Sequence, residues 1–146
     1  MAYTLEAVLL DENAATFEHG LPAVVLAHGL TLVPVTNDLL DALPEGAATS
    51  GVRSAFWKLS EGLEALIVAA SAFGRVAYVE AEFFGGVGTQ AAAVWHEGRV
   101  ILGPQTSSGT GAINAALRLL DVPRTREHDE FDKVGLGRHR HTDRWR

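Results

Sequence analysis

The chain contains no cysteine among its 146 residues. This excludes a disulfide scaffold, a catalytic thiolate, and any zinc or iron–sulfur site with cysteine ligands. A chain of this length buries a core large enough to fold without such crosslinks. The missing thiols are also compatible with the cytoplasm, where we place the protein.

Long hydrophobic runs are absent as well. No apolar stretch reaches the roughly 18 residues that a membrane-spanning helix needs. The first residues, MAYTLEAVLLDE, carry no basic residue before the apolar stretch, unlike a secretory signal peptide. The apolar share of 47% and the charged share of 21% are ordinary for a folded domain, which excludes wholesale disorder. We expect no membrane partner.

Basic residues are scarce over most of the chain. Residues 1–123 carry 5 Lys and Arg against 13 Asp and Glu, whereas residues 124–146 carry 7 against 5, and the total net charge is −6. An acidic body argues against binding of a nucleic-acid backbone. We predict a non-enzymatic binding domain whose acidic surface recognises a basic protein or a small cationic ligand.

The pattern of residues 75–103 predicts a three-stranded antiparallel meander. Residues 76–83 alternate in a period of two, as a half-buried strand does. A glycine-rich loop follows, and Glu97-Gly98 favours a two-residue hairpin turn to the third strand. Because an isolated hairpin is unstable in water, other segments must cover one face of the meander.

The remaining chain mixes helix and strand signals without strict alternation. Further strands are predicted at 3–10, 23–27 and 30–35, the last two joined by a turn at His28-Gly29, and helices at 12–19, 37–43, 60–72, 112–120 and 129–134; residues 45–53 and 103–111 read as loops. This order predicts a two-layer α+β fold, with a mainly antiparallel sheet and helices packed on one face. Residues 1–123 form one globular domain, and residues 124–146 form a C-terminal tail that packs on it or is loosely attached.

Two stretches carry a resemblance. The run YVEAEFFGGVGTQAAAVW, and DEFDKVGLGRHRHTDRW near the C-terminus, resemble stretches of an uncharacterised family of small bacterial proteins. The resemblance implies a bacterial, cytoplasmic protein. It implies no catalytic residues, because that family has no assigned activity.

A candidate cation site lies on one face of the meander. If Phe84 pairs with Thr89, that face carries the cross-strand pairs Tyr78–Trp95, Glu80–Ala93 and Glu82–Ala91. Two carboxylates above an aromatic floor suit a guanidinium or ammonium group. We therefore predict binding residues Tyr78, Glu80, Glu82 and Trp95. The alternative is a solvated sheet face with ordinary glutamates.

A candidate anion site lies in the 106–111 loop, between a strand and a helix. Hydroxyls and free amides at a helix start hold phosphate or carboxylate groups. The residues are Ser107, Ser108, Gly109, Thr110 and Gly111. The alternative is helix capping, which uses the same residue types for the same physical reason.

A candidate divalent-metal site involves His128, His139 and His141, since imidazole ligates zinc, manganese and iron. The alternative is a solvated tail whose basic residues contact the acidic body. An enzymatic alternative uses such a metal, or the carboxylates of Glu80 and Glu82, in a hydrolase or transferase. No other cofactor is predicted.

Overall fold

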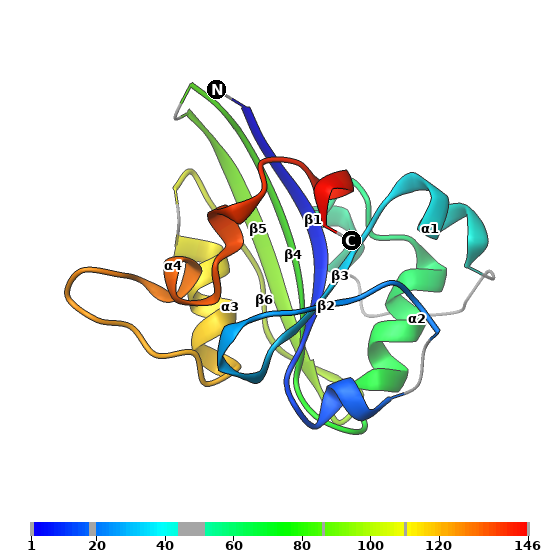
Figure 1. Cartoon of the computed structure of the whole chain (residues 1–146). Coiled ribbons are helices and arrows are strands. Elements are labelled where there is room, and N and C mark those ends of the chain that lie inside the picture. The colour runs from blue at the N-terminus through cyan, green and yellow to red at the C-terminus, as the bar shows by residue number, and fades with distance from the viewer. Residues whose placement is uncertain (1, 18–19, 44–51, 86, 110, 146) are drawn as a thin grey trace.

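A six-stranded sheet runs through the middle of the computed structural model, which describes residues 2–17, 20–43, 52–85, 87–109 and 111–145 (Figure 1). All its pairings are antiparallel and the strand order is β2-β3-β1-β4-β5-β6. The strands are β1 (Ala2–Leu10), β2 (Val24–Val25), β3 (Thr31–Pro34), β4 (Val76–Phe84), β5 (Val87–His96) and β6 (Arg99–Ser107). The predicted antiparallel α+β class is confirmed.

Helices lie on both faces of this sheet, not on one. The helices α1 (Asn37–Ala42) and α2 (Glu61–Ala70) cover one face, and α3 (Gly111–Leu119) and α4 (Glu130–Val134) cover the other (Figure 1). The two-layer arrangement predicted from sequence is therefore wrong. Most of β1 and β4 is buried on both faces of the sheet. Helices or loops cover the side chains that point to one face as well as those that point to the other.

The face under α3 and α4 is apolar along most of the sheet, and it also buries the polar side chain of Gln90. Its buried apolar strand residues are Leu5, Ala7, Leu9, Leu32, Ala77, Val79, Ala81, Ala92 and Val94. Small alanines in β4 and β5 let α3 approach closely, and Ile113 and Leu117 of α3 are fully buried there. This face is a continuous hydrophobic core.

The face under α1 and α2 is apolar over only half its length. Its buried residues include Val8, Leu10, Val33, Val35, Val76, Tyr78, Ala93 and Trp95, packed against Leu39, Leu63 and Ile67 of the helices. Along the same strands, toward the start of β1, the side chains change to Thr4, Glu6, Glu80 and Glu82. The polar half is covered by residues 56–58, hereafter the covering segment.

Three helices begin at a side-chain cap. Thr36, Ser60 and Asp129 each sit in extended backbone and accept a hydrogen bond from the backbone N–H three residues on. Such a cap satisfies one of the amides that a helix start leaves open. The predicted helices near 37–43, 60–72, 112–120 and 129–134 are confirmed to within a few residues.

Two turns use left-handed backbone as predicted. Glu97 has φ 54° and Gly98 φ 76° in the β5–β6 turn, and His28 has φ 61° between β2 and β3. Positive φ at both central residues matches the twist of paired strands.

Two local predictions fail: residues 14–16 form one 3₁₀ turn instead of the start of a longer helix, and β6 continues to residue 107 through the predicted loop. The predicted 45–53 loop falls mostly outside the described residues.

The register of the β4–β5 hairpin differs from the prediction by two residues. Tyr78 lies opposite Ala93, Glu80 opposite Ala91 and Glu82 opposite Thr89, because the tip closes at Phe84 and Val87. A shift of two keeps every side chain on its predicted face. Between β5 and β6 the register also slips, and Ile101, expected in the core, is 43% exposed while Leu102 packs on the α3 side.

The C-terminal tail packs on the body. Val134, Leu136 and Trp145 are buried in the core under α3 and α4, and the Tyr3 hydroxyl donates a 2.8 Å hydrogen bond to the carbonyl of Leu136. The chain then runs beside the start of β1 (Figure 1). Among the described residues, no helix is long and apolar enough to cross a membrane.

Candidate functional site

Two glutamates face each other in the polar half of the sheet. Glu6 of β1 is the register partner of Glu80 of β4, and both side chains are buried. The Glu6 backbone bonds outward, its N–H to Thr142 and its carbonyl to the Val35 N–H, so this is a non-hydrogen-bonded pair. Side chains approach most closely in such pairs. We call Glu6 and Glu80 the carboxylate pair.

Glu80 is held by three hydrogen-bond donors. Its Oε1 accepts from the Trp57 backbone N–H at 2.9 Å, and its Oε2 accepts from the Lys58 backbone N–H at 2.8 Å and from the Tyr78 hydroxyl at 2.6 Å. Phe56 packs its ring edge on Tyr78, with centroids 5.0 Å apart. Glu80 thereby anchors the covering segment to the sheet.

Glu6 is held by groups from two distant parts of the chain. Its Oε1 lies 2.8 Å from Nζ of Lys58, and its Oε2 accepts a 3.0 Å hydrogen bond from the Thr142 hydroxyl. The same hydroxyl oxygen accepts from the Glu6 N–H at 2.9 Å. The covering segment and the C-terminal tail therefore meet on one carboxylate.

The electrostatics of the pair favour an added positive charge or proton. Burial raises the pKa of Glu80; the hydrogen bonds from Tyr78, Trp57 and Lys58 oppose that rise, and the charge of Glu6 adds to it. Burial and the neighbouring Glu80 also raise the pKa of Tyr78, so its hydroxyl stays protonated and donates. With both carboxylates ionised, the single ammonium of Lys58 leaves one negative charge uncompensated.

The cation site predicted from sequence lies in the interior. Tyr78, Glu80 and Trp95 are fully buried, whereas Glu82 is exposed near the end of β4. The four predicted binding residues therefore do not form one exposed surface, because the covering segment and α2 cover Tyr78, Glu80 and Trp95. Glu80 and Glu82 do not meet in one site, so they do not form the carboxylate pair of the enzymatic alternative.

The loop predicted to bind anions caps a helix. The Ser107 hydroxyl accepts from the Ala112 N–H at 3.1 Å and donates to the Gly109 carbonyl at 2.8 Å. The Ile113 N–H bonds at 3.1 Å to the buried side-chain oxygen of Gln90. These bonds take two of the amides at the start of α3. Ser108 is exposed, Gly111 begins the helix, and Thr110 lies outside the described residues.

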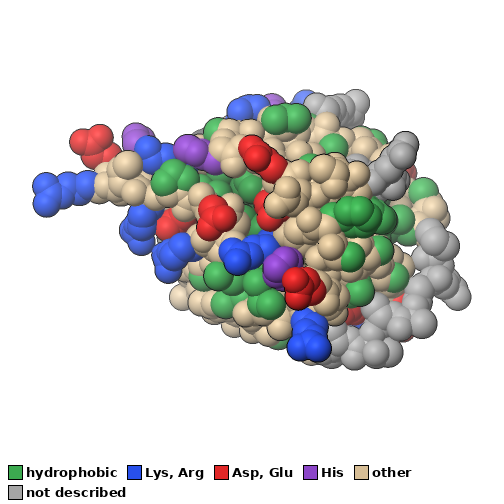
Figure 2. All heavy atoms as spheres, turned by 90° about the horizontal axis from the view of Figure 1, so that it is seen from below, with side chains coloured by type: hydrophobic (Ala, Val, Ile, Leu, Met, Phe, Trp, Pro, Cys, Tyr) green, Lys and Arg blue, Asp and Glu red, His purple; other side chains and the backbone are tan. Residues whose placement is uncertain are grey.

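The three histidines predicted to bind metal lie in separate surroundings. His128 pairs with Asp132 at 3.8 Å, His141 with Asp143 at 3.7 Å, and the His139 ring stands edge-on to Trp145. No group of three or more potential ligands forms within the described part of the chain. Seen from below, the loop between α3 and α4 projects from the body and carries basic, acidic and histidine side chains (Figure 2).

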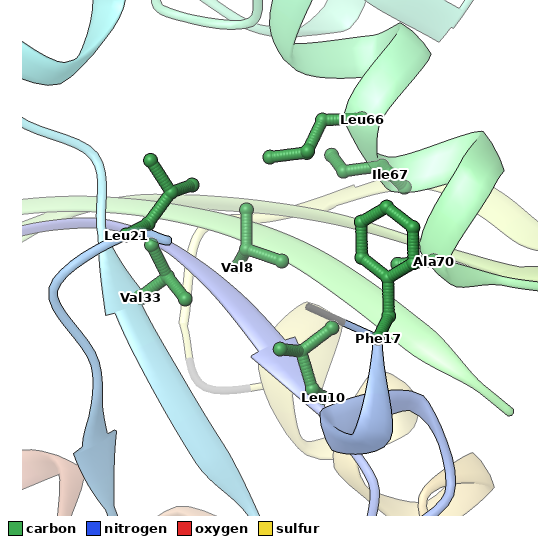
Figure 3. Close-up of a pocket in the computed structure, with 8 residues that line it drawn as sticks. All are labelled: Val8, Leu10, Phe17, Leu21, Val33, Leu66, Ile67 and Ala70. Atoms are coloured by element: carbon green, nitrogen blue, oxygen red, sulfur yellow. The ribbon is translucent and has the colours of Figure 1, made fainter. Parts of the chain in front are cut away.

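A small cavity lies at the opposite, apolar end of the same face (Figure 3). Its volume is about 10 Å³, room for one water molecule at most. Its lining is wholly apolar: Val8, Leu10, Phe17, Leu21, Val33, Leu66, Ile67 and Ala70. Pockets for small-molecule ligands are far larger, roughly 300 Å³ or more. This cavity is a packing gap of the core.

Sequence reasoning missed three members of the site. Glu6 gives a signal, since it is the one charged residue within the strand AYTLEAVLL, and Lys58 is one of only two lysines in the chain. Thr142 gives none, because its partner is 136 positions away. Only the folded structure brings the three together.

Scans against protein-family models, curated proteins and solved structures found no match to this chain. The site geometry therefore carries the functional argument.

Proposed function

We propose that this protein is a non-enzymatic binding domain that recognises a cationic group, an ammonium or a guanidinium, at the Glu6–Glu80 carboxylate pair. One observation carries the proposal: two carboxylates lie directly opposite each other in the protein interior, and among the described residues only Glu6 of the pair contacts an ammonium, which the covering segment supplies through Lys58. In the free protein, Lys58 stands where the cation of the ligand binds.

The arrangement suits exchange of one cation for another. The Lys58 side chain is 20% exposed, whereas that of Glu6 is 5% exposed, so the route from solvent to the pair runs along Lys58. A ligand ammonium offers the same charge and the same three N–H donors as the one it replaces. Binding then exchanges one charge-assisted hydrogen bond for another without leaving a buried carboxylate unpaired.

The charge of the rest of the chain supports approach of a basic ligand. Residues 1–123 have a formal charge of −8. Among their basic residues, Arg53 contacts Glu61 and Glu64, and Arg118 contacts Glu130. A negative field of this kind raises the association rate of cationic partners and weakens as salt is added.

Chemical rescue tests the proposal. Lys58→Ala removes the internal ammonium, and we expect millimolar ethylammonium chloride to raise the melting temperature of this variant by filling the vacated place. The wild type should respond less, because the ligand competes with Lys58. Isothermal titration calorimetry should likewise show that ethylammonium binds Lys58→Ala more tightly than it binds the wild type.

Two controls make the result specific. Lys133→Ala removes the other lysine, on α4, and should gain nothing from ethylammonium beyond the wild-type response. Glu6→Gln combined with Lys58→Ala should abolish the rescue. If sodium chloride at equal ionic strength stabilises Lys58→Ala as well as ethylammonium does, the pair is not a cation-binding site.

A further inference from the structure

The outer edge of β1 beside Glu6 is paired by the tail and not by the sheet. β3 pairs with β1 only from Ala7 to Leu10. Before that point the Thr4 N–H donates to the Arg140 carbonyl at 2.9 Å, in a parallel bridge between Thr4 and His141. Residues 140–142 thus take the place of a neighbouring strand beside Thr4 and Glu6 (Figure 1).

We propose that this edge, from Thr4 to Glu6, docks an extended basic segment of a partner protein in parallel with β1, in place of the chain's own residues 140–142. The inference rests on the proposed function, because it names the form in which the cation reaches the carboxylate pair. The tail is then an intramolecular occupant of a peptide-binding edge. Strand addition of this kind takes affinity from main-chain hydrogen bonds and specificity from side chains.

The contacts of the tail with β1 are transferable to another peptide. They consist of a backbone hydrogen bond from Thr4 and of two hydrogen bonds between Glu6 and the Thr142 hydroxyl. Arg140 contributes only its carbonyl to them, and its side chain is exposed. A segment with a different sequence therefore keeps the main-chain contact.

Charge complementarity selects a basic occupant. The tail, residues 124–146, has a formal charge of +2 and lies on a body of −8. The position of Thr142 is the decisive one, because its hydroxyl touches Oε2 of Glu6 while Lys58 touches Oε1. A lysine or arginine at that position of an incoming segment places its charge on Glu6 and competes with Lys58 directly.

The test uses two synthetic peptides as probes: residues 138–145 of this chain, and the same peptide carrying Thr142→Lys. Binding to the full-length protein is followed by amide shifts in NMR and by titration calorimetry. We expect saturable shifts at Thr4 and Glu6, with roughly tenfold tighter binding of the lysine peptide. The tail amides at 140–142 should shift together with them as the tail is displaced.

Variants of the full chain separate edge docking from general attraction to an acidic protein. Glu6→Gln removes the carboxylate that the lysine contacts and should abolish the roughly tenfold preference for the lysine peptide, whereas Glu82→Gln, at an exposed glutamate of β4, should leave that preference within about twofold. Thr142→Val weakens the intramolecular contact and should tighten binding of the peptides. Each variant is compared with wild type only where its NMR spectrum shows the native fold.

Three results overturn the inference. They are no shift at Thr4 or Glu6 in wild type and in Thr142→Val, shifts that map elsewhere on the surface, and a preference for the lysine peptide that survives Glu6→Gln. If ethylammonium rescues Lys58→Ala while any of these holds, the edge proposal alone fails and the cation site stands. If the rescue fails too, both fail.

Discussion

The two faces of the sheet differ in the kind of side chains that they bury. The face under α3 and α4 buries apolar strand side chains together with Gln90, while the face under α1 and α2 changes halfway along from apolar residues to the Glu6–Glu80 pair. The apolar face is stabilised by area removed from water, which tolerates small shifts. The mixed face depends on named donors, since a buried carboxylate without them is costly. The candidate cation site lies on the second face.

The largest loss of stability on the mixed face should come from Glu80→Leu. The substitution leaves the Trp57 and Lys58 amides and the Tyr78 hydroxyl without their acceptor, and we expect a loss of about 3–5 kcal/mol in the free energy of unfolding. Val79→Ala, one residue away on the apolar face, should cost about 2 kcal/mol. Urea denaturation measures both, and equal losses would erase the distinction between the faces.

Two tryptophans sharpen the comparison next. Trp145 of the tail is 2% exposed in the apolar core, and Trp57 of the covering segment is 49% exposed. Trp145→Ala should cost about 3–5 kcal/mol and Trp57→Ala less than about 1 kcal/mol. Thermal denaturation compares them. A small loss for Trp145→Ala would mean that the tail adds little to the core.

The dependence of stability on pH should have opposite sign on the two sides. The pKa of Glu80 is raised, so the folded state binds its proton more tightly than the unfolded state. Its contribution is therefore present below the ordinary pKa of 4.5 and is lost as pH rises through the folded pKa. Glu80→Gln should remove this decline from the curve of unfolding free energy against pH.

Asp129, on the α4 side, should behave in the opposite way. Burial alone would raise its pKa, but hydrogen bonds from Asp132 and Asn114 and the charge of Arg124 outweigh it and lower the pKa. Its contribution is present above the ordinary value of 3.8 and is lost as pH falls through the folded pKa. Asp129→Asn should reduce the loss on the acid side only, and an unchanged acid limb would contradict the assignment.

The smallest losses of stability should come from removing a serine at a helix start, and they should be equal on the two faces of the sheet. Ser60 caps α2 and Ser107 accepts from the start of α3, so Ser60→Ala and Ser107→Ala should each cost about 1 kcal/mol. Thermal denaturation measures both. If Ser107→Ala were neutral in stability yet abolished binding of inorganic phosphate, the anion-binding alternative for the 106–111 loop would replace capping.

Local features were readable in advance because each depends on neighbours in the chain. The caps at Thr36, Ser60 and Asp129, the turn at Glu97-Gly98 and the left-handed His28 follow from side chains within a few positions. The α+β class follows from the order of these elements. The face to which each residue of β4 and β5 points was also predicted, since a register error of two residues leaves the faces unchanged.

The second helical layer was not readable, and neither was the site that it hides. An exposed acidic strand face and a buried one have the same alternating sequence. They differ only in whether donors arrive from elsewhere: for Glu80 from 22 and 23 positions away, for Glu6 from 52 and 136. Periodicity reports local geometry and is blind to such long-range partners.

The sequence by itself determined the helices, their caps, the meander, the acidic body and the basic tail, because propensity, capping and charge are properties of short segments. Only the tertiary structure decided that Glu80 lies in the core, that Lys58 pairs with the neighbouring Glu6, and that the tail lies along β1. A charge enters a protein interior only when its partners are fixed around it, and the fold as a whole places those partners.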